Sequence, residues 1–224
     1  MGSTAPTIPP PPSSVLRHLI KFDTALSLRL YTITQPILPY SLLKSLEFSG
    51  DGRLFFPLIL SLLLYPLSTT TAATTNPFLL DLFLGALLDL LLIGLLKHLI
   101  RRPRPVYNKN MFVSFAVDHW SFPSGHSSRV SFIATLFYFY SNCVRNLLIN
   151  SRLNQFVVEN IVLIVASWAV ITSVSRVLLG RHFVLDVFAG MFLGVLEGFF
   201  VFRVFNCENL SSFLRQQWMQ DLFL

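Results

Sequence analysis

The sequence predicts an all-α integral membrane protein, built as a bundle of six membrane-spanning helices. Of its 224 residues, 53% are hydrophobic and only 12% are charged, whereas an ordinary soluble domain carries about 25% charged residues. Long apolar runs recur along the chain, and none shows the alternating pattern of a half-buried strand. Because a segment that crosses a bilayer must satisfy its own backbone hydrogen bonds, these runs favour helices.

The apolar runs give the helices in order, since a membrane helix needs about 20 mostly apolar residues. The clearest candidates lie at 77–96, 157–174 and 183–205. Shorter runs at 54–67 and 130–144 can be extended by their flanking residues. The run at 26–46 is the weakest, because it contains two prolines, two basic residues and a glutamine.

These runs predict one membrane domain between two tails. Residues 1–16 are rich in Pro, Ser and Thr and are expected to form a disordered tail. The membrane domain is expected to span 17–206, followed by a polar or amphipathic tail at 207–224. With six spans, the polar loops at 97–126 and 175–182 lie on the same side of the membrane.

The formal net charge of +6 suits an anionic membrane surface or an anionic substrate. Nucleic acid is excluded as a partner, because the basic residues flank apolar spans instead of forming one solvated patch. Cys143 and Cys207 have neither metal-ligand spacing nor the density of a disulfide scaffold. We therefore expect two ordinary thiols.

The first polar cluster is KHLIRRPRP at 97–105, at the end of the third expected span. By itself, a cluster of four cations in eight residues fits a simple anchor in the lipid head groups. Its prolines prevent the helix from continuing, so that Arg102 and Arg104 project from an extended segment. Both side chains could then reach a ligand.

The second cluster, DHWSFPSGHSSR at 118–129, immediately precedes the apolar run at 130–144. Ser124, Gly125 and His126 therefore stand where a helix begins, and free N–H groups with the helix dipole make such a terminus an anion site. Gly125 would let an anion approach the backbone, and Ser124 adds a hydroxyl donor. Taken alone, these residues fit a plain helix cap.

The third cluster is SRVLLGRHFVLD at 175–186. His182 and Asp186 are four residues apart, so at a helix start their side chains share one face. A carboxylate against one imidazole nitrogen fixes the tautomer and makes the other nitrogen a better nucleophile or base. An isolated pair of this kind also fits a structural hydrogen bond.

The three clusters gain meaning when they are placed on one membrane face. They then supply three cations, an anion-binding helix terminus and two histidines. Phosphoryl transfer asks a protein mainly to position its substrate and to neutralise charge on the phosphoryl oxygens. Arginine does so with bidentate hydrogen bonds and lysine as a point charge. The residues that suit this chemistry are Lys97, Arg104, Ser124, His126, Arg176, His182 and Asp186.

The same residues resemble the three signature motifs of the type 2 phosphatidic acid phosphatase (PAP2) superfamily. These motifs are K-x6-RP at 97–105, PSGH at 123–126 and SR-x5-H-x3-D at 175–186. They occur in order with intact internal spacing, and the resemblance covers roughly residues 20–205. LEFSGDG at 46–52 and GRHFVLDVFAG at 180–190 are similar to the plant lipid phosphate phosphatase beta type and to animal polyisoprenoid diphosphate phosphatases.

The resemblance implies the PAP2/haloperoxidase type of helix bundle and a covalent phosphohistidine route. His182 would attack phosphorus, Asp186 would orient its ring, and His126 would act first as acid and then as base. No metal and no other cofactor is expected. The implied phosphate ligands are Lys97, Arg104, Arg176, Ser124 and the backbone at Gly125.

Several polar residues fall outside these motifs. His119 is expected to form hydrogen bonds within its loop, and Arg102 is a rival to Arg104 that the family spacing does not select. The acids Asp81, Asp89 and Glu197 lie inside apolar runs, where a charge costs roughly 2.5–3.5 kcal/mol on insertion scales, so they should face the bundle interior. The glycines at 190, 194 and 198 form a small-residue ridge for a close helix neighbour.

The expected substrate is a lipid phosphate whose tail stays in the bilayer, and both phosphatidate and isoprenoid diphosphates fit. Alternatives are a dolichyl-diphosphate or other phosphoryl-transfer member of the same superfamily, and a non-catalytic membrane protein. Soluble haloperoxidases share the motifs but lack six apolar spans. We expect a multi-pass protein of the endoplasmic reticulum or another endomembrane, while its orientation and oligomeric state stay open.

Overall fold

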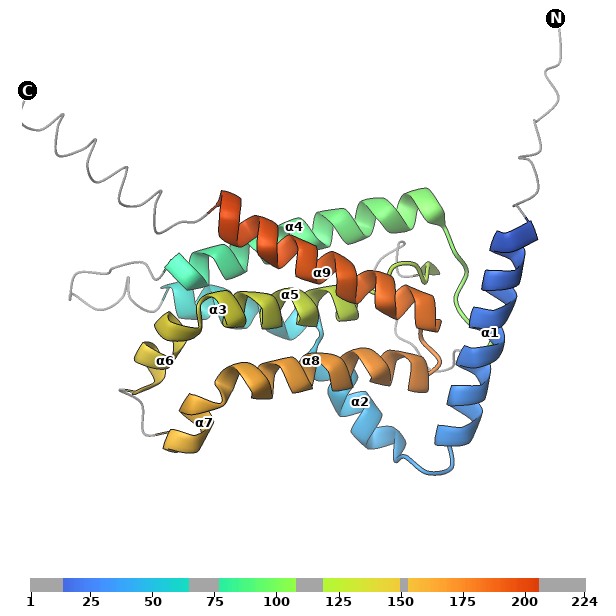
Figure 1. The fold of residues 1–224 in the computed structure, drawn as a ribbon, viewed down its shortest axis with the longest axis horizontal. Helices are drawn as coiled ribbons and strands as arrows, with labels where there is room; N and C mark the ends of the chain where they lie inside the picture. The colour runs from blue at the N-terminus through green and yellow to red at the C-terminus, as the bar shows by residue number, and fades with distance from the viewer. Residues whose placement is uncertain (1–13, 65–76, 108–118, 150–152, 206–224) are drawn as a thin grey trace, which may run out of the picture.

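The computed structural model describes residues 14–64, 77–107, 119–149 and 153–205. Within these ranges the regular structure is helical apart from an isolated bridge between Pro103 and Trp120. The expected all-α fold is confirmed. In Figure 1 the long axis of the molecule is followed by α4 (Pro77–Ile100), α5 (Gly125–Phe139), α8 (Ile161–Leu178) and α9 (Val184–Val204).

The centre of the bundle is α5, which packs against α4, α8 and α9. Its approach to α9 depends on the expected glycine ridge. A Cβ atom at Gly190 would lie 2.4 Å from the carbonyl oxygen of Ser124, and one at Gly194 would lie 2.0 Å from that of Ser128. Larger residues would push the two helices apart, and α9 would lose its contact with the start of α5.

Among the described residues, three helices are long and apolar enough to cross a membrane: α4, α8 and α9. They correspond to the expected runs at 77–96, 157–174 and 183–205. The run at 130–144 forms α5 and α6 (Ser141–Ile149), which meet at a 79° bend and count as a fourth span if taken together. The run at 54–67 gives α3 (Gly52–Leu64), a shorter apolar helix. A short helix, α7 (Gln155–Glu159), precedes α8.

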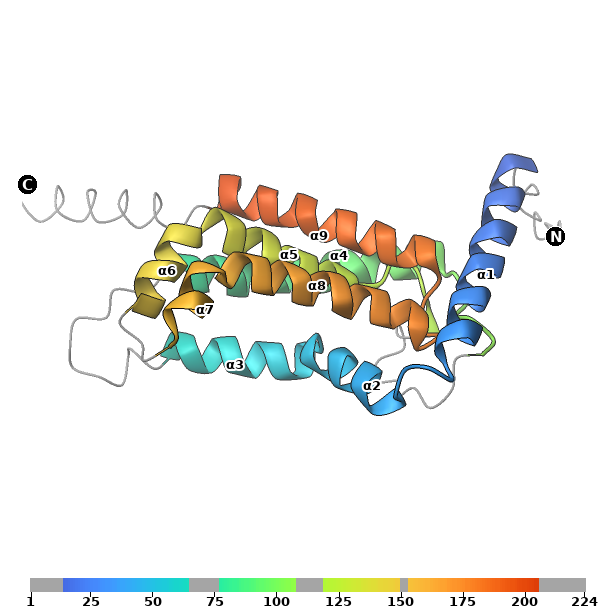
Figure 2. The same ribbon diagram turned by 60° about the horizontal axis from the view of Figure 1, so that its bottom comes forward.

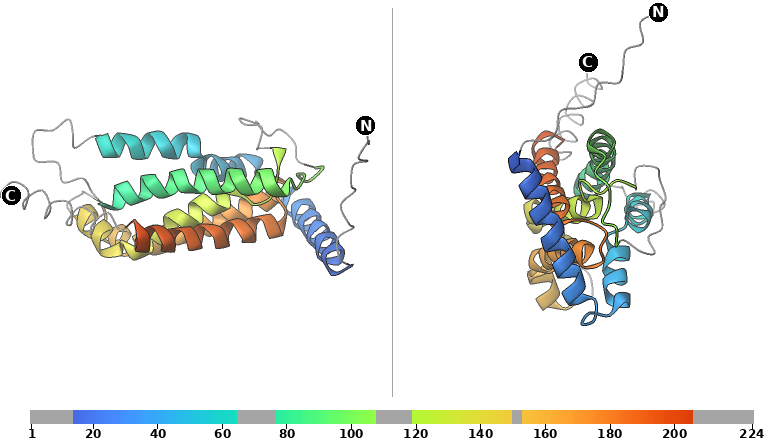
Figure 3. Two further views of the ribbon diagram at one scale, coloured as in Figure 1. Left: turned by 90° about the horizontal axis from the view of Figure 1, so that it is seen from above. Right: turned by 90° about the vertical axis from the view of Figure 1, so that its right-hand side faces the viewer.

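The expectation of a first span at 26–46 is wrong. Residues on either side of Pro36 belong to two helices, α1 (Ser14–Thr34) and α2 (Tyr40–Ser49), because Pro36 and Pro39 interrupt the helix between them. Helix α1 crosses one end of the bundle instead of joining it, as Figures 1 and 3 show, and α2 runs into α3 below α8 in Figure 2. Helix α1 begins within the expected tail at 1–16. Residues 1–13 and the expected tail at 207–224 lie outside the described residues.

The two ends of the bundle differ in composition. The end away from α1 is packed with apolar and aromatic side chains, including Phe132, Leu136 and Tyr140 of the α5–α6 segment.

The acids expected to face inward, Asp81, Asp89 and Glu197, are all buried. Tyr140 donates a hydrogen bond to Asp81, and Arg129 lies 3.3 Å from Asp89.

Candidate active site

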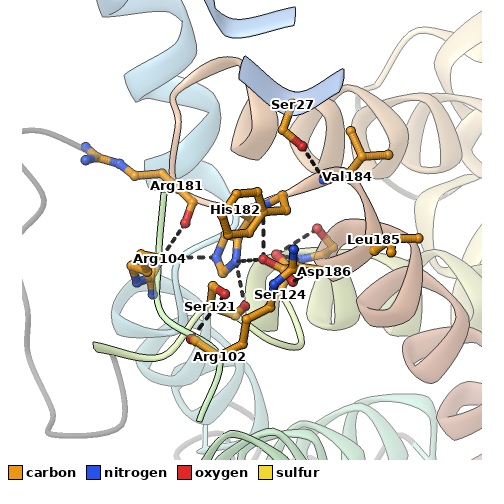
Figure 4. A network of polar contacts seen from close by, with 12 residues as sticks. Ser27, Arg102, Arg104, Ser121, Ser124, Arg181, His182, Val184, Leu185 and Asp186 are labelled. Carbon is orange, nitrogen blue, oxygen red and sulfur yellow. Dashed lines mark hydrogen bonds and ion pairs between the residues drawn. The ribbon is translucent and has the colours of Figure 1, made fainter. Parts of the chain in front are cut away.

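Three loops meet at the end of the bundle that α1 crosses, and Figure 4 shows their side chains pointing toward one another. The loop after α4 carries Arg104, the loop before α5 carries Ser121, and the α8–α9 turn carries His182. Arg104 Nη1 lies 3.3 Å from His182 Nε2 and donates to the carbonyl oxygen of Arg181 at 2.9 Å. The described parts of the two polar loops thus meet at the same end of the bundle.

His182 is buried, and each of its ring nitrogens has a different partner. Nδ1 lies 2.7 Å from the carbonyl oxygen of Ser121. Because a carbonyl oxygen only accepts, this contact assigns the proton to Nδ1 and leaves a lone pair on Nε2. That lone pair faces Arg104, whose guanidinium belongs to the predicted phosphate ligands (Figure 4).

The charge state of His182 follows from its surroundings. Burial lowers the pKa of His182 well below its usual value, and the nearby cations Arg104, Arg176 and Lys97 lower it further. The imidazole is therefore neutral at pH 7. A neutral imidazole with an unprotonated Nε2 is the form that can attack phosphorus.

Asp186 lies beside His182, but its oxygens bind other groups. Its Oδ2 is 3.7 Å from His182 Nδ1, which is too long for a hydrogen bond. The carboxylate instead accepts from the backbone N–H of Phe183 at 2.9 Å and from Arg102 Nη1 at 2.7 Å. The group that hydrogen-bonds the His182 ring directly is thus the Ser121 carbonyl. Asp186 instead organises the first turn of α9.

Arg102 connects this turn to α1. Its second nitrogen, Nη2, donates to Asp23 of α1 at 2.6 Å, and its guanidinium lies 4.1 Å from the centre of the Phe183 ring. Asp23 also accepts from the backbone N–H of Leu185 at 3.0 Å. Ser27, one turn later, accepts from that of Val184 at 3.0 Å. Side chains of α1 therefore cap α9, and Arg102 is an ion bridge between two carboxylates.

The PSGH segment starts α5 as expected. Ser124 is the N-cap, and its hydroxyl accepts from the Ser127 hydroxyl at 2.9 Å. Its backbone N–H donates to the carbonyl oxygen of Asp186 at 2.9 Å, which ties this helix start to α9. His126 lies in the first turn, and its Nε2 is buried without a hydrogen-bond partner among the described residues. That nitrogen is free to exchange a proton with a ligand.

The remaining predicted phosphate ligands, Lys97 and Arg176, are buried at the same end of the bundle. Arg176 Nη1 lies 2.8 Å from Glu47 of α2. The same carboxylate oxygen is 3.3 Å from Nε of the buried Arg181. Two buried guanidiniums thus share one carboxylate at the edge of the site.

The structure brings together all the residues that the motifs predicted and adds Ser121, Asp23 and Glu47. The role of Ser121 rests on its backbone carbonyl, which no side-chain pattern reports. Asp23 of α1 and Glu47 of α2 are both buried. Because the sequence predicts one span at 26–46 across parts of these two helices, it does not predict which of their residues face the site. His119 is exposed.

Known proteins resemble this chain in sequence. The PAP2 superfamily profile matches residues 78–209. A protein of Arabidopsis thaliana called "Probable lipid phosphate phosphatase beta" is 38% identical over 204 residues, covering 86% of this chain and 92% of its own. Phosphatidylglycerophosphatase B of Bacillus subtilis is 34% identical over 125 residues, 56% of either chain.

Solved structures agree with these matches. The crystal structure of a transmembrane PAP2-type phosphatidylglycerolphosphate phosphatase from Bacillus subtilis superposes with a TM-score of 0.64 at 26% identity, covering 82% of this chain and 84% of the other. Aquifex aeolicus LpxE superposes with a TM-score of 0.52 at 24% identity over 80% of this chain and 95% of its own, and supports the fold alone. The motifs, the fold and the matched sequence agree, and the chain belongs to the PAP2 superfamily.

Proposed function

We propose that this protein is a membrane lipid phosphate phosphatase that works through a phosphohistidine on His182. The observation that carries the proposal is the orientation of the His182 ring. Nδ1 is held by the Ser121 carbonyl at 2.7 Å, and Nε2 faces Arg104 at 3.3 Å. A neutral nucleophile is thus held rigidly against the cations that would bind the phosphoryl oxygens.

The first step forms a bond between Nε2 of His182 and phosphorus while the P–O bond to the lipid breaks. The negative charge of the bound phosphoryl group favours the protonated form of His126, which gives its proton to the departing oxygen. The lipid alcohol then leaves, or a lipid monophosphate when the substrate is a diphosphate. In the second step a water attacks phosphorus, His126 takes its proton, and the P–N bond breaks. Inorganic phosphate leaves and His182 is restored.

Charge on the phosphoryl oxygens would be neutralised by Lys97, Arg104 and Arg176, with Ser124 and the backbone at Gly125 as further donors. The N-terminus of α5 adds the positive end of its dipole. These groups can supply the charge neutralisation that phosphoryl transfer requires. We therefore propose that the reaction needs no metal ion.

The substrate class follows from the place of the site and from the relatives. The site lies at the end of helices whose sides are apolar and exposed, including Leu91, Leu95 and Leu99 of α4. A lipid tail can lie along such a surface while its phosphate enters from the end. Phosphatidate and isoprenoid diphosphates both fit, and we propose the endoplasmic reticulum or another endomembrane as the location.

The test is phosphate release from phosphatidate and from farnesyl diphosphate in detergent micelles containing EDTA. We expect release from at least one lipid to persist in EDTA and to resist an excess of glucose 6-phosphate. Loss of release in EDTA with recovery on adding Mg²⁺ would contradict the metal-free route. Faster hydrolysis of the soluble sugar phosphate would contradict the lipid assignment.

A further inference from the structure

Glu47 is a buried carboxylate that none of the three motifs contains. It lies in the last turn of α2, one turn after the buried Leu43, so that both side chains face the bundle. Helix α2 packs against α8, which carries Arg176. A short helix outside the main bundle thereby inserts an acid beside a predicted phosphate ligand.

Glu47 contacts three cations. Its Oε1 lies 2.8 Å from Arg176 Nη1 and 3.3 Å from Arg181 Nε, and its Oε2 accepts from Lys44 at 2.5 Å. Burial raises the pKa of Glu47, but pairing with Arg176, Lys44 and Arg181 outweighs burial and lowers it to about 2. The group is therefore a carboxylate at every pH at which the enzyme would work.

The two arginines need a counter-charge. Arg176 is 2% exposed and Arg181 is fully buried, and a buried charge is costly unless it is paired. Arg181 is turned away from His182 in Figure 4, whereas Arg176 is close enough to lower the pKa of His182. The Glu47 carboxylate thus lies between Arg176, whose charge acts on His182, and Arg181, whose guanidinium is turned away from His182.

Arg176 keeps a donor for a ligand while it is held in this way. Its Nε and Nη1 have no hydrogen-bond partner within the part of the chain that the structure describes. Nη1 is therefore held by the ion pair with Glu47, and Nε is left for a ligand. A guanidinium fixed at Nη1 has its remaining N–H directions set in advance, and such preorganisation lowers the cost of binding an oxyanion.

We propose that Glu47 is a positioning residue for phosphoryl transfer, which holds the Arg176 guanidinium in the orientation that binds a phosphoryl oxygen. The inference rests on the proposed function, because it assigns Arg176 to the substrate phosphate. Glu47 does not touch the substrate. Its effect on phosphate binding passes through Arg176, and this route distinguishes it from a residue that only supports the fold.

The experiment measures inorganic phosphate binding to the full-length protein in detergent by isothermal titration calorimetry. Glu47→Gln should weaken phosphate binding roughly tenfold, and so should Arg176→Gln. If Glu47 acts through Arg176, the double variant should bind less than about twofold more weakly than Arg176→Gln alone. Additive losses would overturn the proposal, as would unchanged binding in Glu47→Gln.

The matched control is Asp51→Asn. Asp51 lies four residues after Glu47, but it pairs at 2.7 Å with the exposed Arg53. Phosphate affinity should stay within about twofold of the wild type in this variant. A loss as large as that of Glu47→Gln would show a general effect of charge removal and overturn the proposal.

Glu47→Asp covers the case in which Glu47→Gln does not fold. The aspartate side chain keeps the negative charge that balances the two arginines, but it is one methylene shorter, so its carboxylate lies farther from Arg176. We therefore expect a near-normal melting temperature and phosphate binding that is several-fold weaker. Wild-type affinity in Glu47→Asp would contradict positioning. If the wild-type protein binds no phosphate, the proposed function fails, and the inference fails with it. If the wild type binds phosphate tightly and the Glu47 variants bind it equally well, only the inference fails.

Discussion

The two ends of the bundle are stabilised by different forces. At the end crossed by α1, buried ions and hydrogen bonds hold His182, Asp186 and Arg102 in place. At the opposite end, the core consists of apolar contacts around Leu136 and Phe132, with one buried hydrogen bond from Tyr140. Helix α5 belongs to both ends, since its first turn caps the site and its last turns fill the apolar core.

This difference separates activity from stability. Ion pairs are directional and position groups accurately, but removing one partner leaves a buried charge. Apolar contacts are non-directional and contribute stability in proportion to buried area. Substitutions at the site end should therefore change catalysis, while those at the opposite end should change unfolding alone.

The largest effect is expected for His182→Ala. Loss of the nucleophile should lower kcat by on the order of 10³-fold or more, because His182 supplies the unprotonated nitrogen that faces Arg104. The variant should still fold, as judged by a melting temperature near that of the wild type. Retained turnover in a folded variant would refute the assignment of His182.

The next effect is expected for Arg104→Gln, which removes the cation closest to Nε2 of His182. The value of kcat/KM for phosphatidate should fall by about 10²-fold, the cost of losing one preorganised donor. The result should appear in steady-state kinetics in micelles. A change of less than twofold would remove Arg104 from the phosphate ligands.

The pH profile sharpens this prediction. Because His182 must be neutral to attack and its pKa lies well below the usual value, the acid limb of kcat/KM should lie below pH ~6.5. Arg104 is the largest lowering cause after burial, so Arg104→Gln should raise that pKa and move the acid limb to higher pH. A shift in the opposite direction would contradict the sign of this electrostatic effect.

Arg102→Gln should have a mixed effect, because Arg102 bridges two buried carboxylates at 2.6 and 2.7 Å. We expect a loss of about 3–5 kcal/mol in the free energy of unfolding, together with a lower kcat as the first turn of α9 loosens. Thermal unfolding and phosphate release measured on the same preparation would check both. Reduced activity with unchanged unfolding would instead indicate direct contact with substrate.

The smallest effect on activity is expected for Leu136→Ala, at the opposite end. The side chain is fully buried, so its truncation should cost about 2–5 kcal/mol of stability. Specific activity of the folded fraction should stay within about twofold of the wild type, since α5 keeps its first turn. A large loss of kcat without a loss of stability would break the comparison between the two ends.

The sequence predicted the site better than it predicted the start of the fold. Residues such as Arg104, His126 and His182 could be found because each motif lies within one short segment at a helix end. The assignment of 26–46 to one span failed because Pro36 and Pro39 interrupt the helix, although the residues on either side of them are mostly apolar. Asp23 and Glu47 were missed for the same reason, since their partners depend on which way α1 and α2 turn.

The most direct test of the account is to trap the covalent intermediate. The protein would be mixed with phosphatidate carrying a radioactive phosphate, denatured at alkaline pH during turnover, and digested for peptide mapping. We predict label on the peptide that contains His182, and none on the His182→Ala protein. Phosphate release by the wild type without labelled protein, or label on any other residue, would contradict the phosphohistidine route.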